Sequence, residues 1–293
     1  MKIGITANPA KPAAIDLARR AAERLRGSAE VCISDETFAL TGGPDAHAPL
    51  ESLAVDALVA IGGDGTFLYT LQRNGAPLLA INAGTVGFLS EIDGSNEPAF
   101  DGALERLVRG LYYIDYRMKL ASQVGGLSLP DAANEVVVHT SQVAKMRLFE
   151  IAIDGRPAGR TRADGVILST PTGSTSYSLS ALGPILEPSV EGIVVSLLAP
   201  FQTTQRAVIL DPLRTVSVRL VSPDRDGVLV VDGQDERRMA AGATIVVYRS
   251  PRRAEFVRFS SRFFRRLRGK KILPWSEEVE EEPPGDADLP TAT

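Results

Sequence analysis

The segment Val59–Leu71 reads VAIGGDGTFLYTL and joins an apolar run to two glycines, an aspartate and a third glycine. The apolar run predicts a buried β-strand that ends at Gly62, and the residues from Thr66 onward predict a helix of about two turns. Ligands tend to bind at the carboxyl ends of strands in open parallel sheets. The segment therefore predicts an α/β sheet with a ligand at this edge.

The glycines of this turn suit phosphate groups, because they allow positive φ angles and let backbone N–H groups approach phosphate oxygens. A second glycine cluster, NAGTVGFLS, follows the next predicted strand. The candidate phosphate-binding residues are Gly62, Gly63, Gly65, Thr66 and Gly84. Asp64 would repel phosphate, so it fits better as a general base for a hydroxyl or as an indirect metal ligand. The alternative is a structural turn in which Asp64 caps the helix.

Strand and helix patterns alternate through residue 112, whereas residues 113–253 contain many short β-type runs and little helical material. The stretch 37–52, TFALTGGPDAHAPLES, has no clear period and is predicted to be a loop. The fold class predicted is an α/β N-terminal domain, Rossmann-like with a mostly parallel sheet, followed by an all-β, β-sandwich-like C-terminal domain. Residues 276–293 read as an acidic, disordered tail.

The composition is that of an ordinary globular protein, with 44% hydrophobic residues and a formal net charge of −4. The last 18 residues hold seven acids and no base, so the rest of the chain is mildly basic. That charge suits a polyanionic small molecule and is too weak to predict nucleic-acid binding. One cysteine and two histidines argue against a zinc site, and no metal site is predicted. No run resembles a leader or a membrane span, so a cytoplasmic protein without membrane contact is expected.

Two further segments carry polar chemistry. Between Ser169 and Ser178, seven residues bear a hydroxyl on serine or threonine, in a density that suits sugar hydroxyls and phosphates. Asn134 and Glu135 open the run NEVVVH, where an amide beside a carboxylate could hold a nucleoside. The alternatives are a linker for the first segment and a polar strand start for the second. VDGQ, which ends at Gln234, reads as a hairpin turn.

Taken together, GGDGTFL, NEVVVH and DGVILSTPTGSTSYSLSALGP closely resemble, in order and spacing, the NAD kinase family. GGDGT is shared with diacylglycerol and sphingosine kinases, whereas the hydroxyl-rich motif is much more specific. The resemblance implies transfer of a phosphoryl group from ATP to the 2′-hydroxyl of the adenosine ribose of NAD, which yields NADP. It also implies a closing helix that returns to the first domain, so that residues 254–275 join residues 1–112.

The resemblance assigns roles to individual residues. Asp64 would be the general base, with Gly65 beside it at the NAD. The other residues implied to contact the dinucleotide are Asn134, Glu135, Lys145, Arg162, Asp164, Thr175, Ser176, Tyr177, Ser178, Leu179, Ser180, Ala199 and Gln234. Mg²⁺ is expected to arrive with ATP, and a homodimer or homotetramer is expected.

One segment departs from the family pattern, which is roughly PHxLxxRP where this chain has PFQTTQRAVIL. Phe201, Thr203 and Ala207 replace the histidine, the leucine and the second proline. This departure bears on the loop and on subunit contacts more than on the chemistry. Two other functions stay open: a lipid kinase that shares GGDGT, and a non-catalytic dinucleotide-binding protein.

Overall fold

A computed structural model describes residues 1–84, 87–221, 226–261 and 263–272. The chain forms two compact units. The first contains Met1–Phe67, Ala76–Asp115 and the segment that begins at Phe256, and the second contains Leu68–Gly75 and Tyr116–Glu255. The predicted acidic tail, 276–293, lies outside the described residues. Within the described part of the chain, no helix is long and apolar enough to cross a membrane.

A parallel sheet forms the centre of the first unit, with the strand order β5-β4-β1-β2-β3 and with β6 also paired to β5. Its strands are β1 (Lys2–Ala7), β2 (Glu30–Ser34), β3 (Ala46–Ala48), β4 (Ala57–Gly62), β5 (Leu78–Asn82) and β6 (Ile92–Asp93). Every residue of β4 and β5 is buried, as expected for strands that are covered on both faces. This sheet confirms the predicted α/β class.

The helices of this unit are α1 (Pro12–Leu25), α2 (Asp35–Thr41), η1 (Leu50–Ser52), α3 (Asp64–Arg73), α4 (Glu97–Val108) and α6 (Phe263–Gly269); the last residues of α3 belong to the second unit. The predicted loop at residues 37–52 was wrong, because most of α2 and all of β3 and η1 lie in it. The Thr37 hydroxyl accepts the N–H of Ala7 at 2.8 Å, and the Phe38 and His47 rings stack at 4.0 Å. Contacts between short segments therefore order a stretch that lacks a local period.

Two sheets of mainly antiparallel strands build the second unit. One has the order β14-β13-β12-β9-β16-β17, and the other includes β11-β10-β15-β18, with β7 paired to β18 and β8. The strands are β7 (Tyr113–Val124), β8 (Leu127–Ser128), β9 (Glu135–Thr140), β10 (Arg147–Ile153), β11 (Arg156–Ala163), β12 (Gly165–Ser169), β13 (Ile193–Leu198), β14 (Val208–Leu210), β15 (Val216–Leu220), β16 (Gly227–Val231), β17 (Asp235–Met239) and β18 (Thr244–Arg258). A core that includes Val136, Phe149 and Leu168 is buried in this unit. The predicted all-β class is confirmed.

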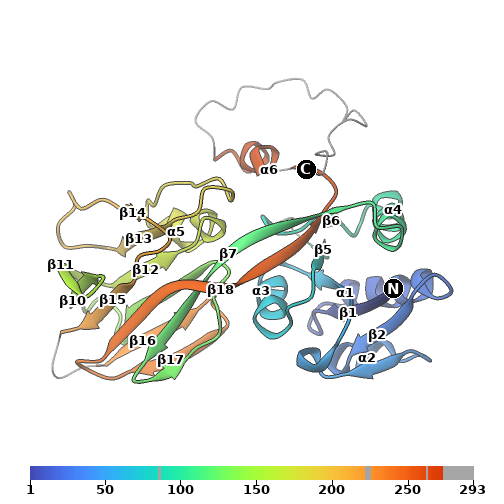
Figure 1. Cartoon of the computed structure of the whole chain (residues 1–293), viewed down its shortest axis with the longest axis horizontal. Coiled ribbons are helices and arrows are strands. Elements are labelled where there is room, and N and C mark those ends of the chain that lie inside the picture. The colour runs from blue at the N-terminus through green and yellow to red at the C-terminus, as the bar shows by residue number, and fades with distance from the viewer. Residues whose placement is uncertain (85–86, 222–225, 262, 273–293) are drawn as a thin grey trace. The chain divides into compact units, whose positions relative to one another are not determined.

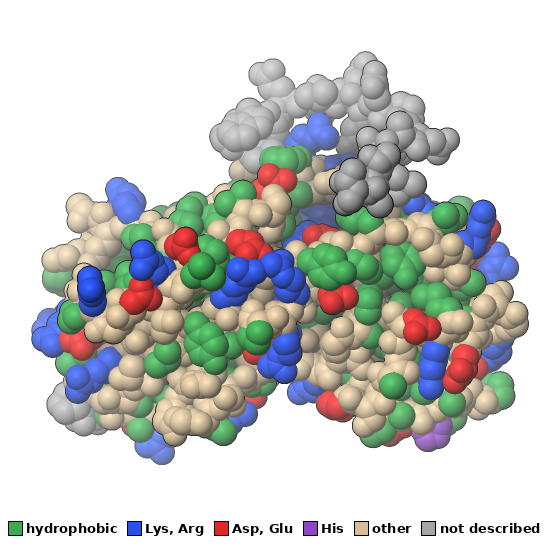
Figure 2. Space-filling view, viewed as in Figure 1, with side chains coloured by type: hydrophobic (Ala, Val, Ile, Leu, Met, Phe, Trp, Pro, Cys, Tyr) green, Lys and Arg blue, Asp and Glu red, His purple; other side chains and the backbone are tan. Residues whose placement is uncertain are grey.

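The long strands β7 and β18 lie side by side (Figure 1). Each has residues in both units, and the end of β18 pairs with β5 in the first unit, Phe256 opposite Leu78. On the face seen in Figure 2, basic and acidic side chains are interspersed over most of the surface. This mixture agrees with the small net charge.

Candidate active site

The GGDGT turn links the end of β4 to the start of α3. A Cβ atom at Gly62 would overlap the side chain of Thr66, so only glycine fits there. Thr66 Oγ1 accepts the Asn8 side-chain amide at 3.2 Å and the Gly63 N–H at 3.5 Å. The turn is therefore held closed by a threonine hydroxyl.

Asp64 is half-buried, and its carboxylate accepts two backbone N–H groups from the second glycine cluster. Phe88 donates to Oδ2 at 2.8 Å, and Leu89 donates to Oδ1 at 3.2 Å. Gly87 packs so close that a Cβ atom there would overlap the carboxylate. The two glycine-rich turns thus meet at Asp64, which keeps further lone pairs for a ligand hydroxyl.

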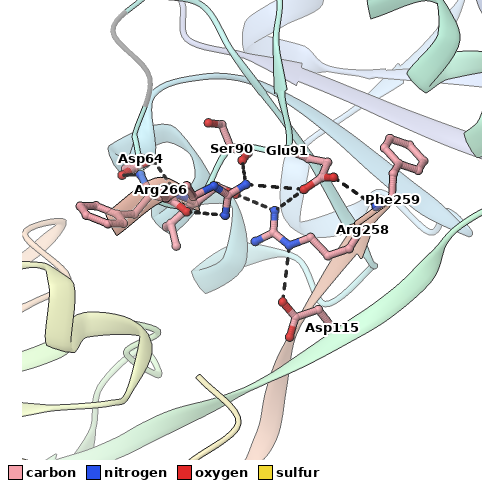
Figure 3. Close-up of polar contacts among 9 residues, drawn as sticks. Asp64, Ser90, Glu91, Asp115, Arg258, Phe259 and Arg266 are labelled. Carbon is pink, nitrogen blue, oxygen red and sulfur yellow. Dashed lines mark hydrogen bonds and ion pairs between the residues drawn. The ribbon is translucent and has the colours of Figure 1, made fainter. Parts of the chain in front are cut away.

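Two arginines hold the loop that orients Asp64 (Figure 3). Arg266 of α6 donates to the carbonyls of Phe88, at 2.7 Å, and Ser90, and Arg258 at the end of β18 donates to that of Leu89 at 3.0 Å. Both guanidinium groups also contact Glu91, whose side chain is completely buried. The predicted closing helix is therefore tied to the first unit, and its arginine supports the aspartate.

Lys11 is a residue that the sequence analysis missed. Its ammonium donates to the Ala83 carbonyl at 3.4 Å and lies 3.3 Å from where a Cβ of Gly84 would stand. It also lies 3.7 Å from the corresponding position at Gly63. A cation therefore sits between the two turns that were predicted to bind phosphate.

In the second unit, Asp232 fixes the backbone of Asn134 and Glu135, the two residues predicted to hold a nucleoside. Its carboxylate accepts the N–H groups of Ala133, Asn134 and Glu135 at 2.8, 2.8 and 3.0 Å. Asp232 and Gly233 have φ angles of 51° and 66°, which suit the two-residue hairpin turn predicted at VDGQ. The motif predicted the turn, but it did not reveal that the aspartate holds a segment about 98 residues away.

Asn134 and Glu135 are both buried, each with 6% of its surface exposed. Burial raises the pKa of Glu135 to about 8, and the nearby Asp232 carboxylate adds to the rise. The Ser176 hydroxyl donates to Glu135 Oε1 at 3.1 Å and opposes that rise. Within the described part of the chain, Asn134 Oδ1 and Glu135 Oε2 have no hydrogen-bond partner. Buried polar atoms without a partner are unusual in the absence of a ligand.

The hydroxyl-rich segment lies beside this pair, as a 3₁₀ turn, η2 (Thr172–Thr175), and a short helix, α5 (Tyr177–Ser180). Thr170 joins the two segments, since its hydroxyl donates to the Ala133 carbonyl at 2.6 Å and its N–H donates to Asn134 at 2.8 Å. Several hydroxyls thus bond within the protein, and Ser178, for example, is completely buried against Ser196. Ser176 and Tyr177 stay accessible.

The remaining predicted contacts also belong to the second unit. Asp164 is half-buried, and within the described residues its Oδ1 has no hydrogen-bond partner. Four others are exposed, and among the described residues no hydrogen bond or ion pair joins their side chains to Asn134 or Glu135: Lys145, Arg162, Ala199 and Gln234. Phe201, which replaces the family histidine, is 70% exposed, and its N–H donates to the Arg162 carbonyl. The described residues contain no group of three or more histidine, cysteine or acidic side chains that could hold a metal ion.

Comparison with known proteins gives consistent matches. Residues 44–112 match the ATP-NAD kinase N-terminal domain, and residues 133–259 match the ATP-NAD kinase C-terminal domain. An NAD kinase from Thermoplasma volcanium is 41% identical over 76% of this chain and 81% of its own length. One from Thermococcus kodakarensis is 39% identical over 90% of this chain and 96% of its own length.

Solved structures agree with these matches. Yeast NADH kinase in complex with NADH has a TM-score of 0.85 and 25% identity, and the match covers 96% of this chain and 90% of that chain. An NAD kinase from Archaeoglobus fulgidus in complex with ATP has a TM-score of 0.76 and 27% identity, over 92% of this chain and 98% of that chain. The protein is a kinase, the class of enzyme that a carboxylate beside glycine turns already favoured. More particularly, the chain belongs to the NAD kinase family.

Proposed function

We propose that the protein transfers the γ-phosphoryl group of ATP to the 2′-hydroxyl of the adenosine ribose of NAD and so makes NADP. The observation that carries this proposal is the pair of buried, unpartnered oxygens on Asn134 and Glu135. The hydroxyl and amino groups of a nucleoside can supply the hydrogen-bond partners that these oxygens lack. A site of this kind rejects molecules without such groups, because its oxygens would stay unpaired.

Asp64 is the proposed general base, which takes the proton from the 2′-hydroxyl as the phosphoryl group is transferred. The N–H groups of Phe88 and Leu89 orient its carboxylate. The proposed phosphate-binding residues are those of the two turns, Gly62, Gly63, Gly65, Thr66 and Gly84. Phosphoryl transfer depends mostly on positioning and charge neutralisation. The turn held closed by Thr66 supplies the positioning.

The other proposed dinucleotide contacts fall in one continuous segment and at five separate positions. Ser176 touches Glu135 directly, and the segment proposed to wrap the nucleoside is Thr175, Ser176, Tyr177, Ser178, Leu179 and Ser180. Lys145, Arg162, Asp164, Ala199 and Gln234 are proposed as further contacts. Mg²⁺ is proposed to come with ATP and to neutralise its phosphates. Assembly into a homodimer or homotetramer is likewise proposed.

The experiment is a product assay. Purified protein is incubated with ATP, Mg²⁺ and NAD, and NADP is measured with a strictly NADP-dependent dehydrogenase. Parallel reactions replace NAD with diacylglycerol or sphingosine and follow radiolabelled phosphate from ATP. NADP that forms only when both ATP and NAD are present supports the proposal. Labelled lipid without NADP, or NAD binding without any product, would overturn it.

A further inference from the structure

The sheet of the first unit brings three segments together at the ends of β1, β4 and β5. Lys11 follows β1, Gly63 follows β4, and Gly84 follows β5. Because β1, β4 and β5 are neighbouring parallel strands, their carboxyl ends lie at one edge. The Lys11 ammonium therefore reaches two turns that are 52 and 73 residues away in the sequence.

The ammonium of Lys11 has donors to spare. Among the described residues it forms one hydrogen bond, a long one of 3.4 Å to the Ala83 carbonyl, and no ion pair. A lysine ammonium has three N–H donors, so at least two can meet a ligand. The side chain is half-buried, so water and salt screen its charge less than they would screen a fully exposed ammonium.

The glycines leave the approach to this ammonium open. Gly63 and Gly84 lack the Cβ atoms that would stand 3.7 and 3.3 Å from Nζ, and Gly84 has a φ angle of 145° that other residues rarely adopt. An oxyanion bound against these turns would therefore contact both their backbone and the Lys11 ammonium. A lysine used in this way acts as a point charge beside the phosphates.

We propose that Lys11 is a direct phosphate ligand, which binds the polyphosphate chain of ATP between the two glycine turns. The proposal rests on the proposed function, since it names a further residue of the same phosphate site. The competing explanation is structural: Lys11 precedes α1 and could serve only to tie that helix start to Ala83. The two explanations differ in whether the effect of its loss depends on phosphate.

The test measures binding by calorimetry in the full-length wild type and in Lys11→Met, Lys11→Arg and Lys2→Met. The two probes are adenosine and the β,γ-imido analogue of ATP, which cannot transfer its γ-phosphoryl group. Lys2 is the matched control, because it is a lysine of the same unit and pairs with Glu30 at the surface. Charge-assisted hydrogen bonds of this type predict a loss of about 10- to 100-fold in affinity for the analogue in Lys11→Met. Adenosine affinity should be unchanged, Lys11→Arg should recover most of the loss, and Lys2→Met should bind like the wild type.

Equal weakening of both probes, or a lower melting temperature with unchanged analogue binding, would overturn the proposal and favour the structural role. The test also separates this proposal from the proposed function. Analogue binding that depends on Lys11, in a protein that makes no NADP, would support the phosphate ligand and refute the NAD kinase reaction. NADP formation with unchanged kinetics in Lys11→Met would support the reaction and refute the ligand.

Discussion

The Cα of Gly87 faces the carboxylate of Asp64 so closely that no side chain fits between them. Gly87→Ala must therefore displace either the loop or the aspartate. Because a shift of about 1 Å in a reacting group can cost about 100-fold in rate, we expect kcat to fall by about that factor. Gly102→Ala is the control, since nothing lies within 4 Å of a Cβ there. Steady-state kinetics of both variants check this, and equal kcat values would contradict the close fit.

Asp64→Asn tests the proposed base without a change of size. The amide cannot accept the proton, so kcat should fall by about 10²- to 10⁴-fold. NAD binding should persist, because Asn134 and Glu135 belong to the other unit. Calorimetry measures NAD affinity and the coupled assay measures kcat. Asp16→Asn, which removes an exposed aspartate paired with Arg19, should behave like the wild type, and full activity in Asp64→Asn would refute the assignment.

Arg266→Gln tests whether α6 supports the aspartate. The variant loses the strong donors to the Phe88 and Ser90 carbonyls, so the loop that orients Asp64 should loosen. We expect kcat to fall about 10-fold or more while the KM for NAD changes little, since charge-assisted bonds of this kind are worth about 1.5 to 3 kcal/mol. Arg265→Gln removes an exposed arginine of the same helix. A matching loss in that control would show that only the charge of the helix matters.

The parts of the fold that depend on local pattern were predictable. Apolar runs in β4 and β5 predicted parallel strands, and the glycines after them predicted turns. The stretch from Thr37 to Ser52 was missed because its order comes from contacts such as that of Thr37 with Ala7, 30 residues away. Periodicity carries no signal for such contacts.

The site was predictable by residue type and less so by contact. The sequence predicted binding roles for Asp64, Asn134 and Glu135, but it could not show that Lys11 lies near Ala83, 72 residues away. It also could not show which hydroxyls serve the protein itself, as Thr170 does at Ala133. These partners are set by the sheet topology, which brings distant strand ends together.

The raised pKa of Glu135 predicts how stability varies with pH. Burial, with the nearby Asp232 carboxylate, raises this pKa to about 8, whereas an unfolded glutamate titrates near about 4.3. The folded state therefore holds a proton that the unfolded state releases, so this contribution to stability is complete below about pH 4.3 and is lost as the pH rises to 8.

Melting temperatures of the ligand-free protein from pH 5 to pH 8.5 measure that loss. The wild type should become less stable over this range, and Glu135→Gln should show a clearly smaller decrease. Asp232, whose pKa burial also raises, acts in the same direction in both proteins, so the difference between the two curves gives the contribution of Glu135, including its coupling to Asp232. Ser176→Ala removes a hydrogen bond that favours the anion, so the decrease should continue to higher pH. Parallel curves for the wild type and Glu135→Gln would show that Glu135 is not held protonated.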